Sequence, residues 1–100
     1  MDSRYVRHMI LKALYANHPG WMPDSLLLRS MDDLGVPLAQ ERLSSELIYL
    51  RDWPNDDRGY VELQSRFVPV SGGTIKESRL TPLGVNLIER LIPRDPMVMV

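Results

Sequence analysis

The sequence contains no cysteine, and this absence excludes several classes of function. Without thiols there are no disulfides, thiolate nucleophiles, zinc knuckles or iron–sulfur ligands. No apolar run approaches the roughly 20 residues that a membrane-spanning helix needs. The charged start, with Arg4, Arg7 and Lys12, leaves no apolar core for a signal peptide. These absences predict a cytoplasmic chain that makes no membrane contact.

The chain also lacks an excess of charge of one sign, because its formal net charge is −1. Such a chain has no general attraction to nucleic acid. The charge is nevertheless unevenly distributed. Residues 1–12 and 58–80 each carry +2, whereas residues 13–57 hold three basic and eight acidic residues. Any contact with DNA is therefore expected to depend on local clusters of basic residues.

The size and composition indicate one globular domain. A chain of 100 residues with a hydrophobic fraction of 44% can bury one core without metal or disulfide support. No internal repeat or low-complexity tract divides it. We predict a domain over residues 1–92 and a short apolar tail over residues 93–100, which frays unless it docks on a partner.

Apolar residues at helical spacing predict three helices in the first half of the chain, over 3–17, 24–34 and 39–52. Asp2 or Ser3 can cap the first helix, and Asp24 can cap the second. Gly35 suits a left-handed C-cap, but the third helix has no capping side chain at position 38 or 39. The residues that form the three apolar stripes are Val6, Ile10, Ala13 and Leu14; Leu27, Met31 and Leu34; and Leu43, Leu47 and Leu50.

The pattern changes after residue 59. Residues 60–64 alternate as a half-buried strand does, and residues 74–80 can return from a turn at 71–73. Pro69 cannot pair in a central strand, so residues 66–70 are expected in an extended hairpin loop. Thr81 and Pro82 open a last helix, whose apolar side is Leu83, Leu87, Ile88 and Leu91. The sequence therefore predicts a mainly α fold with a small β-hairpin (α+β), in the order helix, helix, helix, hairpin, helix.

Two stretches of the sequence resemble a winged helix-turn-helix domain. Residues 34–37 and 43–50 resemble a turn and a recognition helix, and residues 79–88 resemble the "strand, L-T-x-x-G, helix" step that leaves the wing. The chain is also similar to small winged-helix proteins encoded in Mu-like phages and prophages, which share a Ser-Leu-Leu opening of the second helix. The long wing, with residues 66–73 as an insertion, departs from the usual pattern. This resemblance implies the winged-helix fold and, by analogy with that topology, a DNA-binding transcriptional regulator or accessory factor.

In such a domain the third helix would enter the major groove of double-stranded DNA. Arg42 could then donate two hydrogen bonds to a guanine edge, and Ser45 could contact a base or a phosphate. Gln40 and Ser44 flank this face and could contact phosphates. The candidate phosphate contacts on the wing are Arg66, Lys76 and Arg79. One small module makes few phosphate contacts, so a homodimer is expected.

Two alternatives to DNA binding stay open for the third helix. Glu41 and Asp52 on the same face would repel phosphates, and the face could simply be solvated. Alternatively, Ile48 and Tyr49 could form a protein interface with a second copy or with a phage or host protein. Tyr49 could instead fold back over the wing. The apolar tail 97–100 could take part in such an interface.

The sequence offers no pattern for catalysis. His8 and His18 are ten residues apart with no third ligand at a suitable spacing, so no metal site is predicted. Ser71, Gly72 and Gly73 are not followed by the helix and Lys-Ser/Thr pair of a phosphate-binding loop. We therefore predict a non-enzymatic chain without cofactor, metal or small-molecule substrate. Trp21 and Trp53 are interpreted as core plugs or loop anchors.

Overall fold

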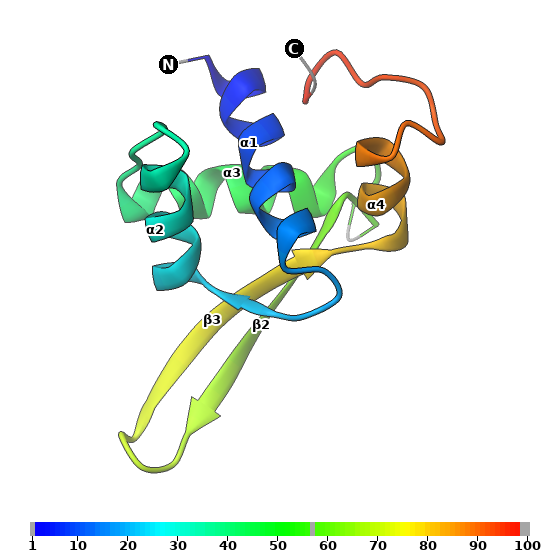
Figure 1. Ribbon diagram of the computed structural model, residues 1–100. Coiled ribbons are helices and arrows are strands. Elements are labelled where there is room, and N and C mark those ends of the chain that lie inside the picture. Colours follow the sequence, from blue (N-terminus) through cyan, green and yellow to red (C-terminus); the bar gives the residue numbers. More distant parts are fainter. Residues whose placement is uncertain (1, 57, 99–100) are drawn as a thin grey trace.

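The computed structural model describes residues 2–56 and 58–98 and has an α+β architecture (Figure 1). Within these residues, there are four helices and one three-stranded antiparallel sheet. The helices are α1 (Ser3–Ala16), α2 (Asp24–Asp33), α3 (Gln40–Asp52) and α4 (Pro82–Ile88), and the strands are β1 (Met22–Pro23), β2 (Val61–Val68) and β3 (Gly73–Leu80). The strands are ordered β1-β3-β2, so the central strand β3 pairs with both others.

The helix ends follow the capping chemistry of the sequence with one exception. The Asp2 side chain accepts from the Arg4 N–H at 2.8 Å, and the Thr81 hydroxyl accepts from the Gly84 N–H at 3.1 Å. Gly35 has a φ of +80°, as its place after α2 requires. Asp24 is not the N-cap of α2 as predicted. Pro23 occupies that position because it belongs to β1, and Asp24 is the first helical residue.

The hairpin differs from its prediction in length. Residues 66–68, expected in a loop, continue β2 to Val68, where that residue pairs with Gly73. Pro69 follows the last paired residue, so its missing N–H interrupts no ladder bond. Strand β1 is absent from the sequence prediction. Its two residues, paired with Ser78 and Glu77 of β3, are too few to show an alternating pattern.

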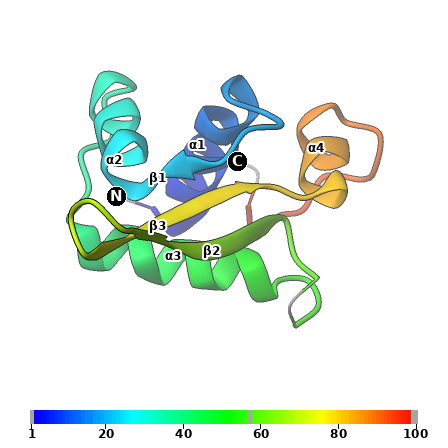
Figure 2. The same cartoon turned by 90° about the horizontal axis from the view of Figure 1, so that it is seen from below.

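The core lies where the helices meet the base of the hairpin. The predicted stripes of α1 and α3 are buried, as are Leu27 and Met31 of α2. Leu34 is exposed, because it lies beyond the last residue of α2. In Figure 2 the hairpin runs between α3 on one side and α1 and α2 on the other. This arrangement leaves the outer surface of α3 uncovered.

The C-terminal segment packs on the domain, contrary to the predicted frayed tail. The Asp95 carboxylate accepts from the Trp53 indole N–H at 2.6 Å and from the Tyr60 hydroxyl. Val98 is fully buried, whereas Leu91, predicted on the apolar side of the last helix, is 69% exposed. Burial and the Asp95 carboxylate raise the pKa of the Tyr60 hydroxyl. Residues 99 and 100 of the predicted interface tail lie outside the described residues.

Candidate nucleic-acid interface

The surface of helix α3 has four sides, which face the core, α1, the hairpin and the outside of the molecule. Leu43, Leu47 and Leu50 are buried in the core. At 100° per residue, positions 42, 46 and 49 form the flank toward α1, and positions 40, 44 and 51 form the flank toward the hairpin. Positions 41, 45, 48 and 52 form the outermost stripe. The predicted site residues of α3 are therefore divided among three sides.

Arg42 lies on the flank toward α1, away from the outer stripe that carries Ser45. Its guanidinium donates to the Ser3 hydroxyl at 3.1 Å and forms an ion pair with Glu46 at 3.4 Å. Glu46 is only 5% exposed and also accepts from Arg7 Nε at 3.0 Å. The structure thus places Arg42 in the contact between α1 and α3, rather than beside the other predicted base-reading residue.

Tyr49 lies on the same flank as Arg42. The Arg7 guanidinium carbon lies 3.6 Å from the centroid of the Tyr49 ring. The ring also stacks on Trp53, with centroids 5.6 Å apart. Tyr49 is half-buried by these contacts. It therefore does not fold over the hairpin, which was one expectation for this residue. It also shares no exposed surface with Ile48, which was the other.

The remaining predicted residues of α3 lie near the solvent. Ser45 is exposed and Ile48 is 47% exposed on the outermost stripe. The Gln40 side-chain amide donates to Asp24 at 3.1 Å and to the Ser44 hydroxyl at 3.2 Å. Gln40, Ser44 and Ser45 thus form one polar surface at the N-terminal half of α3. This surface lacks a basic side chain of its own.

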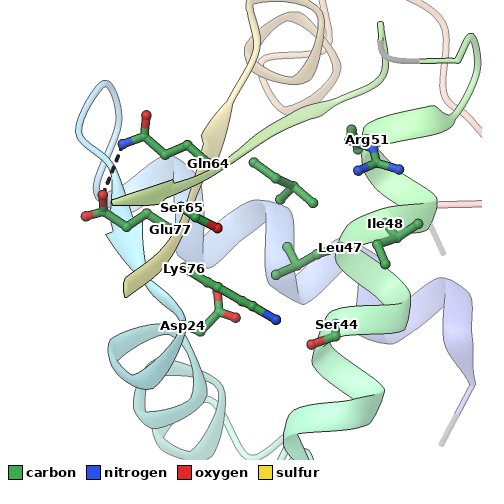
Figure 3. A pocket seen from close by; sticks show the side chains of 10 residues that line it. Asp24, Ser44, Leu47, Ile48, Arg51, Gln64, Ser65, Lys76 and Glu77 are labelled. Atoms are coloured by element: carbon green, nitrogen blue, oxygen red, sulfur yellow. Dashed lines mark hydrogen bonds between the residues drawn. The ribbon is translucent and has the colours of Figure 1, made fainter. Parts of the chain in front are cut away.

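A cleft of about 360 Å³ separates α3 from the hairpin (Figure 3). Arg51 lies on the helix wall, and Lys76 extends from the strand wall toward the helix. Burial raises the pKa of the Asp24 carboxyl at the end of the cleft, and the hydrogen bond from Gln40 and the charge of Lys76 partly offset this rise. The lining residues are Asp24, Ser44, Leu47, Ile48, Arg51, Leu63, Gln64, Ser65, Lys76 and Glu77.

The three predicted cations of the hairpin are not brought together. Arg66 pairs with Glu77 at 3.1 Å, and this bond, followed by one from Gln64, holds the pKa of Glu77 below its usual value. Because side chains alternate along a strand, Lys76, opposite Ser65, lies on the other face of the hairpin from Arg66.

Arg79 lies nearer the base of the hairpin. Its guanidinium carbon is 4.3 Å from the centroid of the Trp21 ring, and it contacts Glu62 at 3.4 Å. Trp21, interpreted as a core plug or loop anchor, therefore supports this arginine. Of the three hairpin cations, only Lys76 faces the cleft with α3.

Sequence reasoning missed three charged residues of the cleft, Asp24, Arg51 and Glu77. The sequence suggests Asp24 only as a helix cap, and Arg51 enters only the charge balance. A signal for Arg51 was present, because Ser44, Ile48 and Arg51 are spaced i, i+4 and i+7 and must share one side of a helix. Asp24 carried no such signal, since its approach to Lys76 depends on how β1 pairs with β3.

The described residues contain no group of three His, Asp or Glu side chains that could hold a metal ion. Residues 2–56 and 58–98 likewise include no helix long and apolar enough to cross a membrane. No family model, no curated protein and no solved structure matches the chain. The case for function therefore depends on the geometry and on the resemblance of the sequence described above.

Proposed function

We propose that this chain is a winged helix-turn-helix protein that binds double-stranded DNA. Its likeness to small winged-helix proteins of Mu-like phages favours a role as a cytoplasmic transcriptional regulator or accessory factor, without catalysis. The observation that carries the proposal is an uncovered helix, α3, beside a projecting hairpin, with Arg51 of the helix and Lys76 of the hairpin both lining the cleft between them. An exposed helix can enter the major groove while the hairpin follows the adjacent backbone.

The chemistry of α3 supports base contacts from its polar surface. Ser44 and Ser45 can donate or accept, and the Gln40 amide oxygen can accept from a base while its N–H groups keep their bonds to Asp24 and Ser44. These three residues replace Arg42 in the proposed readout, because using Arg42 would require breaking its contacts with Ser3 and Glu46. Arg42→Ala should therefore lower the stability of the fold more than it changes base preference.

The phosphate contacts are assigned to Lys76, Arg51 and Arg66, and Arg51 makes its contact by leaving the ion pair that it forms with Asp52 at 2.9 Å. Lys76 is exposed, and Arg66 keeps an exposed side chain despite its bond to Glu77. Each neutralised phosphate lowers the slope of log affinity against log salt by about 0.9. So few contacts give weak binding by a single copy, and we therefore propose that the chain binds DNA as a homodimer.

Fluorescence anisotropy with labelled 20-base-pair duplexes of mixed sequence, between about 50 and 200 mM salt, tests the proposal. Lys76→Ala should weaken binding to every duplex and make the salt slope shallower by about 1. Lys12→Ala, an exposed lysine of α1 outside the cleft, is the matched control and should bind as the wild type does. Binding absent up to millimolar protein, or equal losses in both variants, would contradict the proposal.

A second candidate is a protein-interaction module, and the outer stripe of α3 specifically favours it. Ile48 is 47% exposed on the same stripe of the helix as Glu41, which would be repelled by phosphates. Under this hypothesis, Ile48→Asp should abolish self-association or capture of a phage or host partner in sedimentation and pull-down measurements, with an unchanged circular dichroism spectrum. Retained association would exclude this surface.

A further inference from the structure

The outer half of the hairpin, residues 65–76, forms a two-stranded arm that projects from the helices (Figure 1). Strand β1 pairs only with Ser78 and Glu77, so the ladder beyond these residues has two strands. Four paired residues of β2, from Ser65 to Val68, extend the arm by about 13 Å before its turn. The arm is therefore long enough to reach into a DNA groove while the helices stay outside it.

The composition of the arm differs from that of the rest of the chain. Residues 65–76 contain no carboxylate and carry two cations, Arg66 and Lys76. Its outer end is apolar and uncovered, since Phe67 is 61% exposed and Val70 is 99% exposed. The arm thus combines cations nearer the body with exposed apolar side chains at its apex.

We propose that the arm inserts its apolar apex into the minor groove of duplex DNA and opens a base step there. This inference rests on the proposed DNA-binding function and adds the groove, the mode of entry and the class of duplex. Apolar side chains placed between base pairs unstack the step and bend the duplex. Phe67 and Val70 are the side chains assigned to this contact.

The two cations fit the two walls of that groove. Arg66 and Lys76 lie on opposite faces of the arm, as the pairing of Arg66 with Ile75 and of Lys76 with Ser65 requires. A ribbon entering the groove end-on would therefore present one cation to each phosphate backbone. Residues 65–76 contain no carboxylate, and the nearest one, Glu77, is 6% exposed and paired with Arg66, so repulsion from the phosphates is small.

The dimensions of the groove explain why entry should deform the DNA. The minor groove is about 6 Å wide and about 7.5 Å deep, whereas a ribbon that turns its two faces toward the groove walls is about 10 Å thick with its side chains. The apex can reach the floor, but the ribbon cannot follow unless the groove widens. We therefore expect preference for flexible TA and CA/TG steps over stiff A-tracts.

The test measures bending separately from binding. Duplexes of 20 base pairs with a central TA step and a fluorophore at each end report bending by energy transfer, and anisotropy on the same duplexes reports affinity. Wild-type protein should bend the duplex by about 20–90°. Val70→Ser and Phe67→Ser should remove most of the bend and weaken binding about threefold to tenfold, with an unchanged salt slope.

Two controls complete the design. Leu91→Ser changes an apolar residue that is 69% exposed and follows α4, outside the arm, and this variant should bend DNA as the wild type does. A duplex with a mismatched central step, already partly unstacked, should bind the wild type more tightly and the Val70→Ser variant without that gain. Circular dichroism confirms that each variant is folded.

The possible results distinguish a failure of groove insertion by the arm from a failure of DNA binding as a whole. Binding without bending, or full bending by both arm variants, overturns the inference and leaves the proposed function intact. No binding to any duplex overturns both. If sedimentation shows that Val70→Ser or Phe67→Ser breaks a dimer while bending persists, the apex contacts protein and the inference is wrong.

Discussion

At the scale of single residues, the most constrained group is the buried carboxylate of Glu46. It accepts from Arg7 at 3.0 Å and lies 3.4 Å from Arg42, so it joins two cations from two helices. A buried ion pair adds little net stability, but removing one partner leaves the other charge uncompensated. Arg7 also donates to the Met97 carbonyl at 3.0 Å, which ties the C-terminal segment to the same contact.

Glu46→Ala should therefore lower the free energy of unfolding by about 2–4 kcal/mol, because Arg7 would lose its charged partner in a largely buried place. Urea denaturation followed by circular dichroism measures this change. Glu41→Ala, on the exposed side of the same helix, is the control and should change stability by less than about 0.5 kcal/mol. Equal effects of the two substitutions would contradict the assigned role of Glu46.

His8 should make stability depend on pH. Burial first, and then the charges of Lys12 and Arg90, lower its pKa in the folded chain below the usual 6.5. Between the lowered pKa and 6.5 the unfolded chain binds more protons, so stability rises with pH in that window and is lost as pH falls through it. In His8→Gln, the midpoint temperature of unfolding should vary less with pH in this range. His18→Gln is the control, and its midpoint temperature should vary with pH as that of the wild type does. If His8→Gln left the pH profile unchanged, His8 would not be the group responsible.

At the scale of elements, α4 is fixed against the base of the hairpin by a close backbone approach. A Cβ at Gly84 would lie 2.2 Å from the Tyr60 carbonyl oxygen, which is backbone and cannot rotate away. The Thr81 hydroxyl accepts from Gly84 N–H and donates to the Gly59 carbonyl at 2.8 Å, which secures the same junction. The helix can therefore dock here only if its third residue has no side chain.

Gly84→Ala should accordingly destabilise the fold by about 1–3 kcal/mol through overpacking, with a fall in the thermal midpoint. The matched substitution, Gly73→Ala at the start of β3, meets no atom closer than 3.7 Å. It should leave the midpoint within about 2 °C of the wild type. A larger loss for Gly73→Ala than for Gly84→Ala would refute this packing argument.

The elements also show what the sequence could and could not predict. The helices were predictable because each long one carries a repeated apolar stripe, as Leu43, Leu47 and Leu50 do in α3. The full length of β2 was not, because Pro69 argues against a strand in the residues beside it, although it lies just beyond the last pair. Nothing local marks the docking of the C-terminal segment, since Asp95 reaches Trp53 and Tyr60 only in the folded chain.

At the scale of the whole molecule, the candidate site depends on the rotation of α3 about its own axis, which decides which of its residues face α1 and which face the hairpin. The sequence predicts which residues of α3 are buried, but its polar residues could face either α1 or the hairpin. The contacts of Arg7 and Ser3 decide this, and they withdraw Arg42 from the outer surface while Ser45 stays exposed. Lys76 is the predicted hairpin cation that faces α3 across the cleft.

Chemical-shift mapping most directly tests the central claim that α3 and the arm together contact DNA. A titration of labelled protein with a 20-base-pair duplex at low salt should perturb the backbone amides of Gln40, Ser44 and Ser45 and those of residues 65–76. The amides of α4 should stay unchanged, apart from any perturbation that also appears with high salt alone. Perturbations confined to α4 and the C-terminal segment, or none at millimolar duplex, would contradict the account.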